Sequence, residues 1–213
     1  MKKELSQKEI LNFLKSTQSP LRRRAAKLIG KLRISKFGKE LFEAYLRERE
    51  DKRTWETQME MIKSLGLIGF KPALKIVEQI CKINNPHDAI TSAAAETYVR
   101  LKRKSLSDAT PILELLEFGK LSVAHGAVDP LGYDRMTPSK DQVLKLIKLC
   151  WNLGKNKGTG YGDPRYGIAA ACAGWDKELT TPFLEHCLKT AGRETGLEYV
   201  AKNSLKGKYV KLR

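Results

Sequence analysis

The sequence predicts an all-α protein, and more specifically a right-handed α-solenoid of about six two-helix repeats. Similar segments recur every 32 to 42 residues, a period typical of helical repeat arrays. Small residues stand at fixed places within these segments, as they do where helices pack closely. No segment alternates between apolar and polar residues as a half-buried strand would. The 213 residues, 41% of them hydrophobic, suffice for one domain over residues 1–213.

One set of predicted helices, here called the inner helices, is found by aligning the repeats on a single position. Small or apolar residues stand four places before that position, so one face of each helix is expected to pack against its neighbour. Ser19-Pro20 and Asp163-Pro164 predict helix starts, with Ser or Asp as the N-cap, and Asp88 and Thr195 are further N-cap candidates. The aligned residues are Ile29, Leu65, Tyr98, Leu131, Ala173 and Leu205, and the packing residues are Ala25, Met61, Ala94, Ala127, Ala169 and Ala201.

A second set of amphipathic segments, the outer helices, alternates with the first. Pro72, Pro111, Pro138 and Pro182 are expected at or near their starts, and Pro130 alone is expected inside a helix. Pairing each outer helix with an inner one gives a repeat whose stacking buries a continuous core. The outer segments are residues 8–16, 39–48, 72–81, 111–118, 139–151 and 182–191.

A glycine-rich segment, residues 154–162, lengthens the fifth repeat. Its sequence GKNKGTGYG lacks the pattern of a phosphate-binding loop, and no predicted strand precedes it. We interpret it as an inserted loop, either a solvated connector or a basic loop that touches a partner. The C-terminal tail, residues 206–213, is similarly either a basic arm or a solubilising cap.

The charge balance predicts an anionic partner. Forty Lys and Arg residues against 24 Asp and Glu give a net charge of +16, which favours nucleic acid, an anionic membrane surface or an acidic protein. No apolar run approaches the roughly 18 residues that span a bilayer, and the N-terminus lacks an apolar signal core. We therefore expect a cytoplasmic protein without membrane attachment.

The cysteines and histidines predict no metal site and no cofactor. No two of the four cysteines have C-x-x-C spacing, and all four lie in apolar helical stretches. We expect them to be reduced thiols in the core. The three histidines are scattered and form no ligand triad.

Two columns of cations are candidates for binding. One lies on the inner-helix face opposite the alanines, where side chains four residues apart form a row. The other stands four places after the aligned residue, in positions expected near helix C-termini: Arg33, Lys102, Arg135 and Lys177. Each column is alternatively a solvated face or a set of favourable helix-dipole interactions. The predicted binding residues are Arg23, Lys27, Lys31, Lys63, Arg100, Arg135 and Lys177.

A possible pocket in the fourth repeat involves Asp129. His125 and Asp129 lie one turn apart before Pro130, whose ring would kink a helix and open space beside Tyr133 and Trp175. Asp129 would then act as a general base or electrostatic stabiliser. The alternative, which we favour, is that Asp129 is the N-cap of a shortened helix. We assign Trp55 and Trp151 to packing.

The helix pairs, with Ala-x-x-x-Leu-Gly in the second helix and proline in the first, resemble the HEAT-repeat family from about Leu5 to about Leu205. That resemblance implies a single HEAT-like domain that serves as a binding scaffold. A basic subset, the AlkD-like DNA glycosylases, is similar in size and charge and implies catalysis through Asp129 with Tyr133 and Trp175.

The sequence therefore leaves three functional hypotheses. The first is a non-enzymatic scaffold whose basic concave face holds nucleic acid or an acidic or nucleic-acid-associated protein. The second is a glycosylase that acts on alkylated bases. The third is an adaptor or neutralising protein for one specific protein. The oligomeric state stays open.

Overall fold

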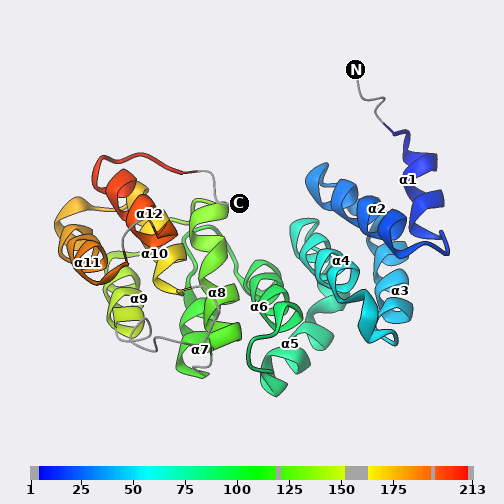
Figure 1. Cartoon of the computed structure of the whole chain (residues 1–213), viewed down its shortest axis with the longest axis horizontal. Coiled ribbons are helices and arrows are strands. Elements are labelled where there is room, and N and C mark those ends of the chain that lie inside the picture. The colour runs from blue at the N-terminus through cyan, green and yellow to red at the C-terminus, as the bar shows by residue number, and fades with distance from the viewer. Residues whose placement is uncertain (1–4, 119–120, 152–162, 193–194, 211–213) are drawn as a thin grey trace. The chain divides into compact units, whose positions relative to one another are not determined.

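The computed structural model describes residues 5–118, 121–151, 163–192 and 195–210 (Figure 1). Its regular structure consists of twelve α-helices and short 3-10 turns, and these described residues contain no strand. The all-α prediction is therefore confirmed. The inserted loop at 154–162 and the last three residues of the tail, 211–213, lie outside the described residues.

The chain divides into two compact units. The N-terminal unit comprises residues 1–83 and 89–101, and the C-terminal unit comprises residues 84–88 and 102–213. The first holds α1 (Gln7–Leu14), α2 (Ser19–Lys31), α3 (Gly38–Glu48), α4 (Trp55–Leu67), α5 (Leu74–Ile83) and α6 (Ala89–Lys102) except its last residue. The second holds α7 (Thr110–Phe118), α8 (Leu121–Tyr133), α9 (Lys140–Trp151), α10 (Arg165–Ala171), α11 (Lys177–Thr190) and α12 (Gly196–Leu205).

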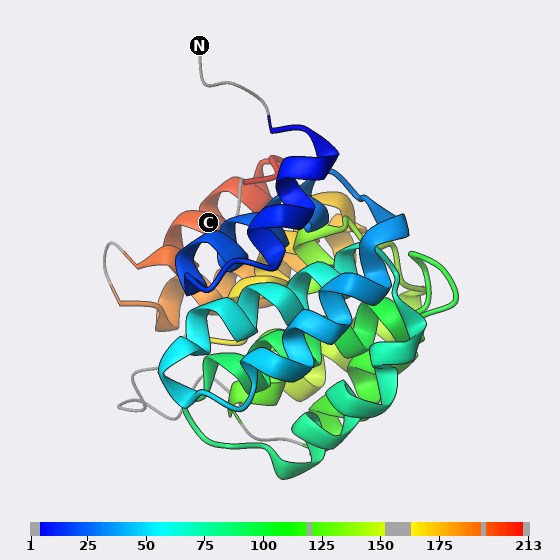
Figure 2. The ribbon, with the colours of Figure 1, turned by 90° about the vertical axis from the view of Figure 1, so that its right-hand side faces the viewer.

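The even-numbered helices are the predicted inner helices, and the odd-numbered ones are the outer helices. In the N-terminal unit α2 packs along α4, with α1 against α2 and α3 against α4 (Figures 1 and 2). In the C-terminal unit α10 packs on both α8 and α12. The predicted packing column is buried throughout, with exposed fractions of 0% at Ala25, Met61, Ala94, Ala127, Ala169 and Ala201.

Two inner-helix packings in the N-terminal unit share one arrangement, here called the glycine–hydroxyl contact. The Ser64 hydroxyl donates to the Ala26 carbonyl at 2.8 Å, and the Thr97 hydroxyl donates to the Ile62 carbonyl at 2.9 Å. Each hydroxyl residue lies against a glycine of the preceding helix, Gly30 or Gly66. A Cβ at Gly30 would come within 2.9 Å of the Ser64 Cβ, so only glycine allows this approach.

Three inner helices end in the same way at the aligned residue. The carbonyls of Ile29, Leu65 and Leu131 each accept a bond from the amide five residues later, at 3.0 Å. The residue before that amide is left-handed, with φ of 53° at Arg33, 71° at Gly69 and 50° at Arg135. This is the Schellman ending of a helix. In α12 the corresponding bond is accepted by Asn203, two residues before the aligned Leu205.

Helix starts agree with the sequence in part. The Thr195 hydroxyl accepts from the Glu198 amide at 3.3 Å, as an N-cap does. The Asp163 carboxylate accepts from the Arg165 amide at 2.9 Å, but Asp163 lies one residue before Pro164, which is the N-cap of α10. Ser19 is not an N-cap: α2 begins at Ser19 itself, and its hydroxyl points to other helices.

Two proline predictions are wrong. Pro182 lies inside α11, because that helix begins at Lys177, five residues before the predicted start, where Asp176 caps it by accepting from the Glu178 amide at 3.0 Å. Asp129 is not the N-cap of a shortened helix either, since α8 continues through Pro130 to Tyr133.

The remaining structural predictions concern thiols and membranes. Cys81, Cys150, Cys172 and Cys187 are all buried and free, as expected. Among the described residues no cluster of His, Cys, Asp and Glu could hold a metal ion. None of the described helices combines the length and apolar character needed to cross a membrane.

Candidate functional site

The charge of the chain is most one-sided in α2 and the turn that follows it. Residues 21–39 contain eight Lys or Arg residues and no Asp or Glu. Arg22 and Arg23 pair with carboxylates of other helices. The other six, here called the α2 cation cluster, are exposed and form no ion pair with another described residue: Arg24, Lys27, Lys31, Arg33, Lys36 and Lys39.

Helix geometry explains why the cluster faces solvent. Ala25, Ala26, Ile29 and Gly30 bury one side of α2 against neighbouring helices. Arg24, Lys27 and Lys31, three and four residues apart, consequently share the opposite side. Apart from Pro20, these three are the exposed residues of α2.

The turn after α2 extends the cluster. Arg33 takes a left-handed conformation with φ of 53°, which costs a non-glycine residue about 1 kcal/mol, and its guanidinium donates to the Leu67 carbonyl at the end of α4. Lys36 lies over the Phe37 ring, 5.4 Å from its centroid. These contacts involve the charged ends of both side chains but supply no opposing charge.

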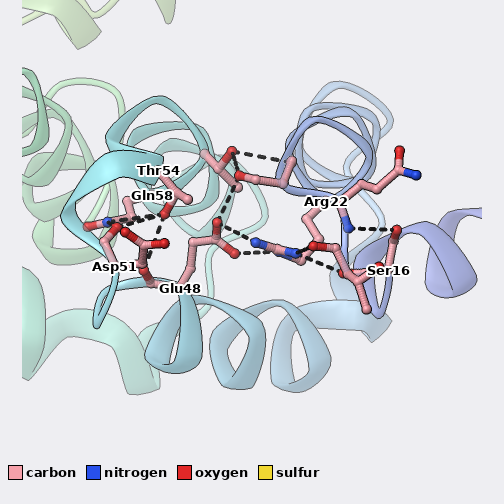
Figure 3. A network of polar contacts seen from close by, with 10 residues as sticks. Ser16, Arg22, Glu48, Asp51, Thr54 and Gln58 are labelled. Atoms are coloured by element: carbon pink, nitrogen blue, oxygen red, sulfur yellow. Dashed lines mark hydrogen bonds and ion pairs between the residues drawn. The ribbon is translucent and has the colours of Figure 1, made fainter.

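A buried polar network fixes the beginning of α2 (Figure 3). The Arg22 guanidinium meets both oxygens of Glu48, at 2.5 and 2.8 Å, and also donates to the Ser16 and Thr17 carbonyls at 2.8 Å. Burial raises the pKa of Glu48, but the hydrogen bonds from Arg22, Ser19 and Thr54 outweigh burial and bring that pKa below its usual value. Arg22 therefore joins α2 to α3 and is committed to the fold.

A small cavity adjoins this network but has no dominant charge. About 240 Å³ in volume, it is lined by Leu14, Lys15, Ser16, Arg22, Ala44, Arg47, Glu48 and Asp51. Since cations and carboxylates both line it, it does not extend the cation cluster.

Acidic residues of α4 and α6 neutralise the remaining predicted contacts of the N-terminal unit. Arg23 pairs with Glu56, Lys63 meets Glu96 at 3.2 Å, and Arg100 also pairs with Glu96. Arg100 is 9% exposed, so it is buried rather than presented to a partner. Lys27 and Lys31 are thus the predicted residues that this unit leaves exposed and outside ion pairs with described residues.

Glu60 adds a further acidic group between α2 and α4. Burial raises its pKa, and the nearby cations Lys27 and Lys63 lower it in part. The face therefore changes from purely cationic on α2 to mixed on α4 and α6.

The two predicted contacts of the C-terminal unit, Arg135 and Lys177, differ in their surroundings. Arg135, left-handed after α8, places its guanidinium over the Tyr209 ring, 4.7 Å from the centroid. Lys177 is exposed, but the expectation that it lies near a helix C-terminus is wrong. It is the first residue of α11, where a cation interacts unfavourably with the helix dipole.

The residues predicted for catalysis do not form one open site. Trp175 is 8% exposed, and its indole N–H donates to the Met136 carbonyl at 2.8 Å. Asp129 is 9% exposed on α8, whereas Tyr133, at the end of that helix, is 43% exposed. Burial raises the pKa of Tyr166, with smaller contributions from Asp129 and Tyr199, so Tyr166 is an aromatic neighbour of Asp129 that the sequence did not indicate.

Sequence reasoning also missed Trp55. Assigned to packing, this residue is 47% exposed. Its spacing to Gln58 and Ile62 matches the buried side of α4, but Trp55 is the first residue of the helix, so neighbouring helices cover it only in part. The signal available was the charged segment around it, residues 50–56, which holds five charged residues and is unusual beside a core tryptophan. Trp151 does pack, with its ring 4.3 Å from that of His186.

Comparison with known proteins adds no relative: no protein-family model matches the sequence, and no curated protein matches it either.

Proposed function

We propose that the chain is a right-handed, HEAT-like α-solenoid that acts as a non-enzymatic scaffold and binds nucleic acid through the α2 cation cluster. Support for the solenoid comes from the regular alternation of inner and outer helices and from the repeated glycine–hydroxyl contact. The observation that carries the function is the set of six exposed cations that form no ion pair with another described residue.

Unpaired cations suit phosphates because no internal ion pair must break before binding. Arg24 and Lys31 lie about 10 Å apart along the helix axis, at 1.5 Å per residue. Several backbone phosphates fall within such a span, since duplex DNA carries one charge per roughly 1.7 Å of axis. Arg23 and Lys63 would instead have to leave Glu56 and Glu96. The α2 cation cluster is therefore the preferred phosphate contact.

The test neutralises three members of the cluster together. We expect Arg24→Gln, Lys27→Gln and Lys31→Gln in one variant to weaken binding of a 20-nucleotide probe by tenfold or more at low salt. We also expect the slope of log affinity against log salt to fall by up to about 2.1, since each phosphate contact on a single strand contributes about 0.7. Fluorescence anisotropy between about 50 and 200 mM salt measures both.

A charge-matched control separates a local site from net charge. Lys145→Gln, Lys148→Gln and Lys189→Gln remove three exposed cations from α9 and α11 of the C-terminal unit. This variant should lose less than about threefold in affinity. Equal losses in the two variants would show that binding follows net charge. Failure of the unaltered protein to bind any nucleic acid, with retention on polyglutamate, would contradict the proposal and favour an acidic protein as partner.

A further inference from the structure

Trp55 is exposed at the edge of the same helical layer as the α2 cation cluster. It is the first residue of α4, and 47% of its surface is open. The other two tryptophans are engaged, Trp151 against His186 and Trp175 in the bond to Met136. Exposing a large indole ring to water is unfavourable, and a flat ligand that covers the ring would remove it from water.

Polar contacts place the first turn of α4, which carries Trp55, beside the start of α2. Glu56, the next residue after Trp55, pairs with Arg23. One residue further along, the Thr57 hydroxyl lies 2.7 Å from the Ser19 hydroxyl. Lys27 is one helical turn beyond Arg23, about 6 Å along the axis, a distance comparable to one nucleotide of extended backbone.

Cations also precede Trp55 in the chain. The η2 turn (Lys52–Thr54) carries Lys52 and Arg53, both exposed. Asp51 orients Arg53 through two hydrogen bonds, at 2.9 and 2.8 Å, so Arg53 is largely neutralised while Lys52 is not. Trp55 thus lies three residues after Lys52 in the chain and directly before Glu56, which pairs with Arg23 of α2.

We propose that Trp55 stacks on an unpaired base, so that the preferred ligand is single-stranded nucleic acid whose phosphates lie on Lys27 and Lys31. This rests on the proposed function and narrows it. Bases in a duplex stack on one another and offer no free face, whereas bases of a single strand stack on aromatic side chains that stand beside a cationic track. The stacking does not depend on base identity, because every base has a flat face.

The test compares single strands with a duplex. Oligo-dT, oligo-rU and a 20-base-pair DNA duplex are titrated at about 100 mM salt, with anisotropy and tryptophan emission both recorded. We expect Trp55→Ala to weaken single-strand binding about 5- to 100-fold, the range of one base–aromatic stack, and duplex binding by less than twofold. Trp55→Phe should keep most of the affinity. The dT and rU arms show whether the sugar matters.

Fluorescence gives a second reading. Single strands should quench the emission of the unaltered protein, the duplex should not, and the quenching should vanish in Trp55→Phe. Leu106→Ala is the matched control, because Leu106 is also 47% exposed but lies in the C-terminal unit. It should leave all affinities unchanged.

Three outcomes are distinguishable. Loss of binding in the α2 triple variant with no effect of Trp55→Ala and no quenching would overturn the stacking and leave the proposed function standing. Equal losses for single strand and duplex in both Trp55 variants would also overturn the stacking, since Trp55 would then support the fold of the surface. No binding by the unaltered protein would remove both proposals.

Discussion

The two units join their inner helices by different means. In the N-terminal unit a hydroxyl of one helix bonds to a backbone carbonyl of the preceding helix, opposite a glycine, first at Ser64 and again at Thr97. The same repeat position in the C-terminal unit holds Pro130, Cys172 and Ser204. The Ser204 hydroxyl is buried and has no hydrogen-bond partner among the described residues.

In the C-terminal unit Gly167 of α10 lies against the backbone of Val128 in α8, and ion pairs and a tryptophan hydrogen bond add further contacts. Arg165 is 4% exposed and meets Asp163 at 2.5 Å and Thr190 at 2.7 Å, while Arg103 pairs with Asp134 at 2.8 Å. The Trp175 indole belongs to the same set of contacts.

This difference shows why net charge alone does not locate a site. The N-terminal unit has 21 Lys or Arg against 11 Asp or Glu, and the C-terminal unit has 19 against 13. The numbers of cations are similar, but backbone contacts between α2 and α4 leave the cations of α2 outside the packing. What matters for binding is which cations the fold leaves uncompensated.

The largest effect should come from filling a glycine contact. In Gly66→Ala the new Cβ would lie 2.9 Å from the Thr97 Oγ1 and 3.0 Å from its Cα, so α4 and α6 would have to separate. We expect a loss of about 1–3 kcal/mol in the free energy of unfolding, typical of an overpacked contact, measured by urea denaturation. Gly196→Ala is the control, because its Cβ meets only the Tyr166 ring, at 3.2 Å. Equal effects of the two changes would remove the distinction between the units.

A smaller effect should follow from removing the hydroxyl alone. Thr97→Val keeps the branched shape but loses the bond to the Ile62 carbonyl. A neutral buried hydrogen bond contributes about 0.5–1.5 kcal/mol, so unfolding should become easier by that amount. The change in the denaturant midpoint, with the slope of unfolding free energy against denaturant unchanged, measures this loss. An unchanged midpoint would mean that glycine packing without the hydrogen bond joins these helices.

The smallest effect is expected in the C-terminal unit. Ser204→Ala removes a buried hydroxyl that has no partner among the described residues, so stability should stay the same or rise by up to about 1 kcal/mol. The measurement compares the thermal unfolding midpoints of the unaltered protein and the Ser204→Ala variant. A clear loss of stability would show that Ser204 makes the same kind of contact as Ser64 and Thr97.

Much of the fold could be predicted from the sequence because its regularity is local. The column that includes Ala25 and Ala169 predicted which face of each inner helix is buried, since a small residue at the same place in successive helices is typical of close helix packing. Asp163 and Thr195 marked helix starts through hydrogen bonds to amides two and three residues later. Pro182 misled the prediction because the cap at Asp176 overrides the usual preference of proline for a first turn.

The candidate site was harder to predict because it depends on pairs between helices. Glu56 of α4 neutralises Arg23 of α2, and Glu96 of α6 neutralises Lys63 of α4. Each pair joins residues more than 30 positions apart, so neither could be predicted from the sequence of one helix alone. Trp55 has the spacing of a core residue, and its exposure follows from its place at the first turn of α4. Lys27 and Lys31 were predicted because the exposed face of an amphipathic helix is a local property.

The buried thiols have a practical consequence for spectroscopy. Burial raises the pKa of Cys81, Cys150 and Cys187 to about 12 and raises that of Cys172 as well, so almost no thiolate exists at neutral pH. Maleimide dyes should therefore spare the native cysteines while the protein is folded. A single cysteine introduced on the outward side of α2 could carry a fluorophore or spin label without first building a cysteine-free background.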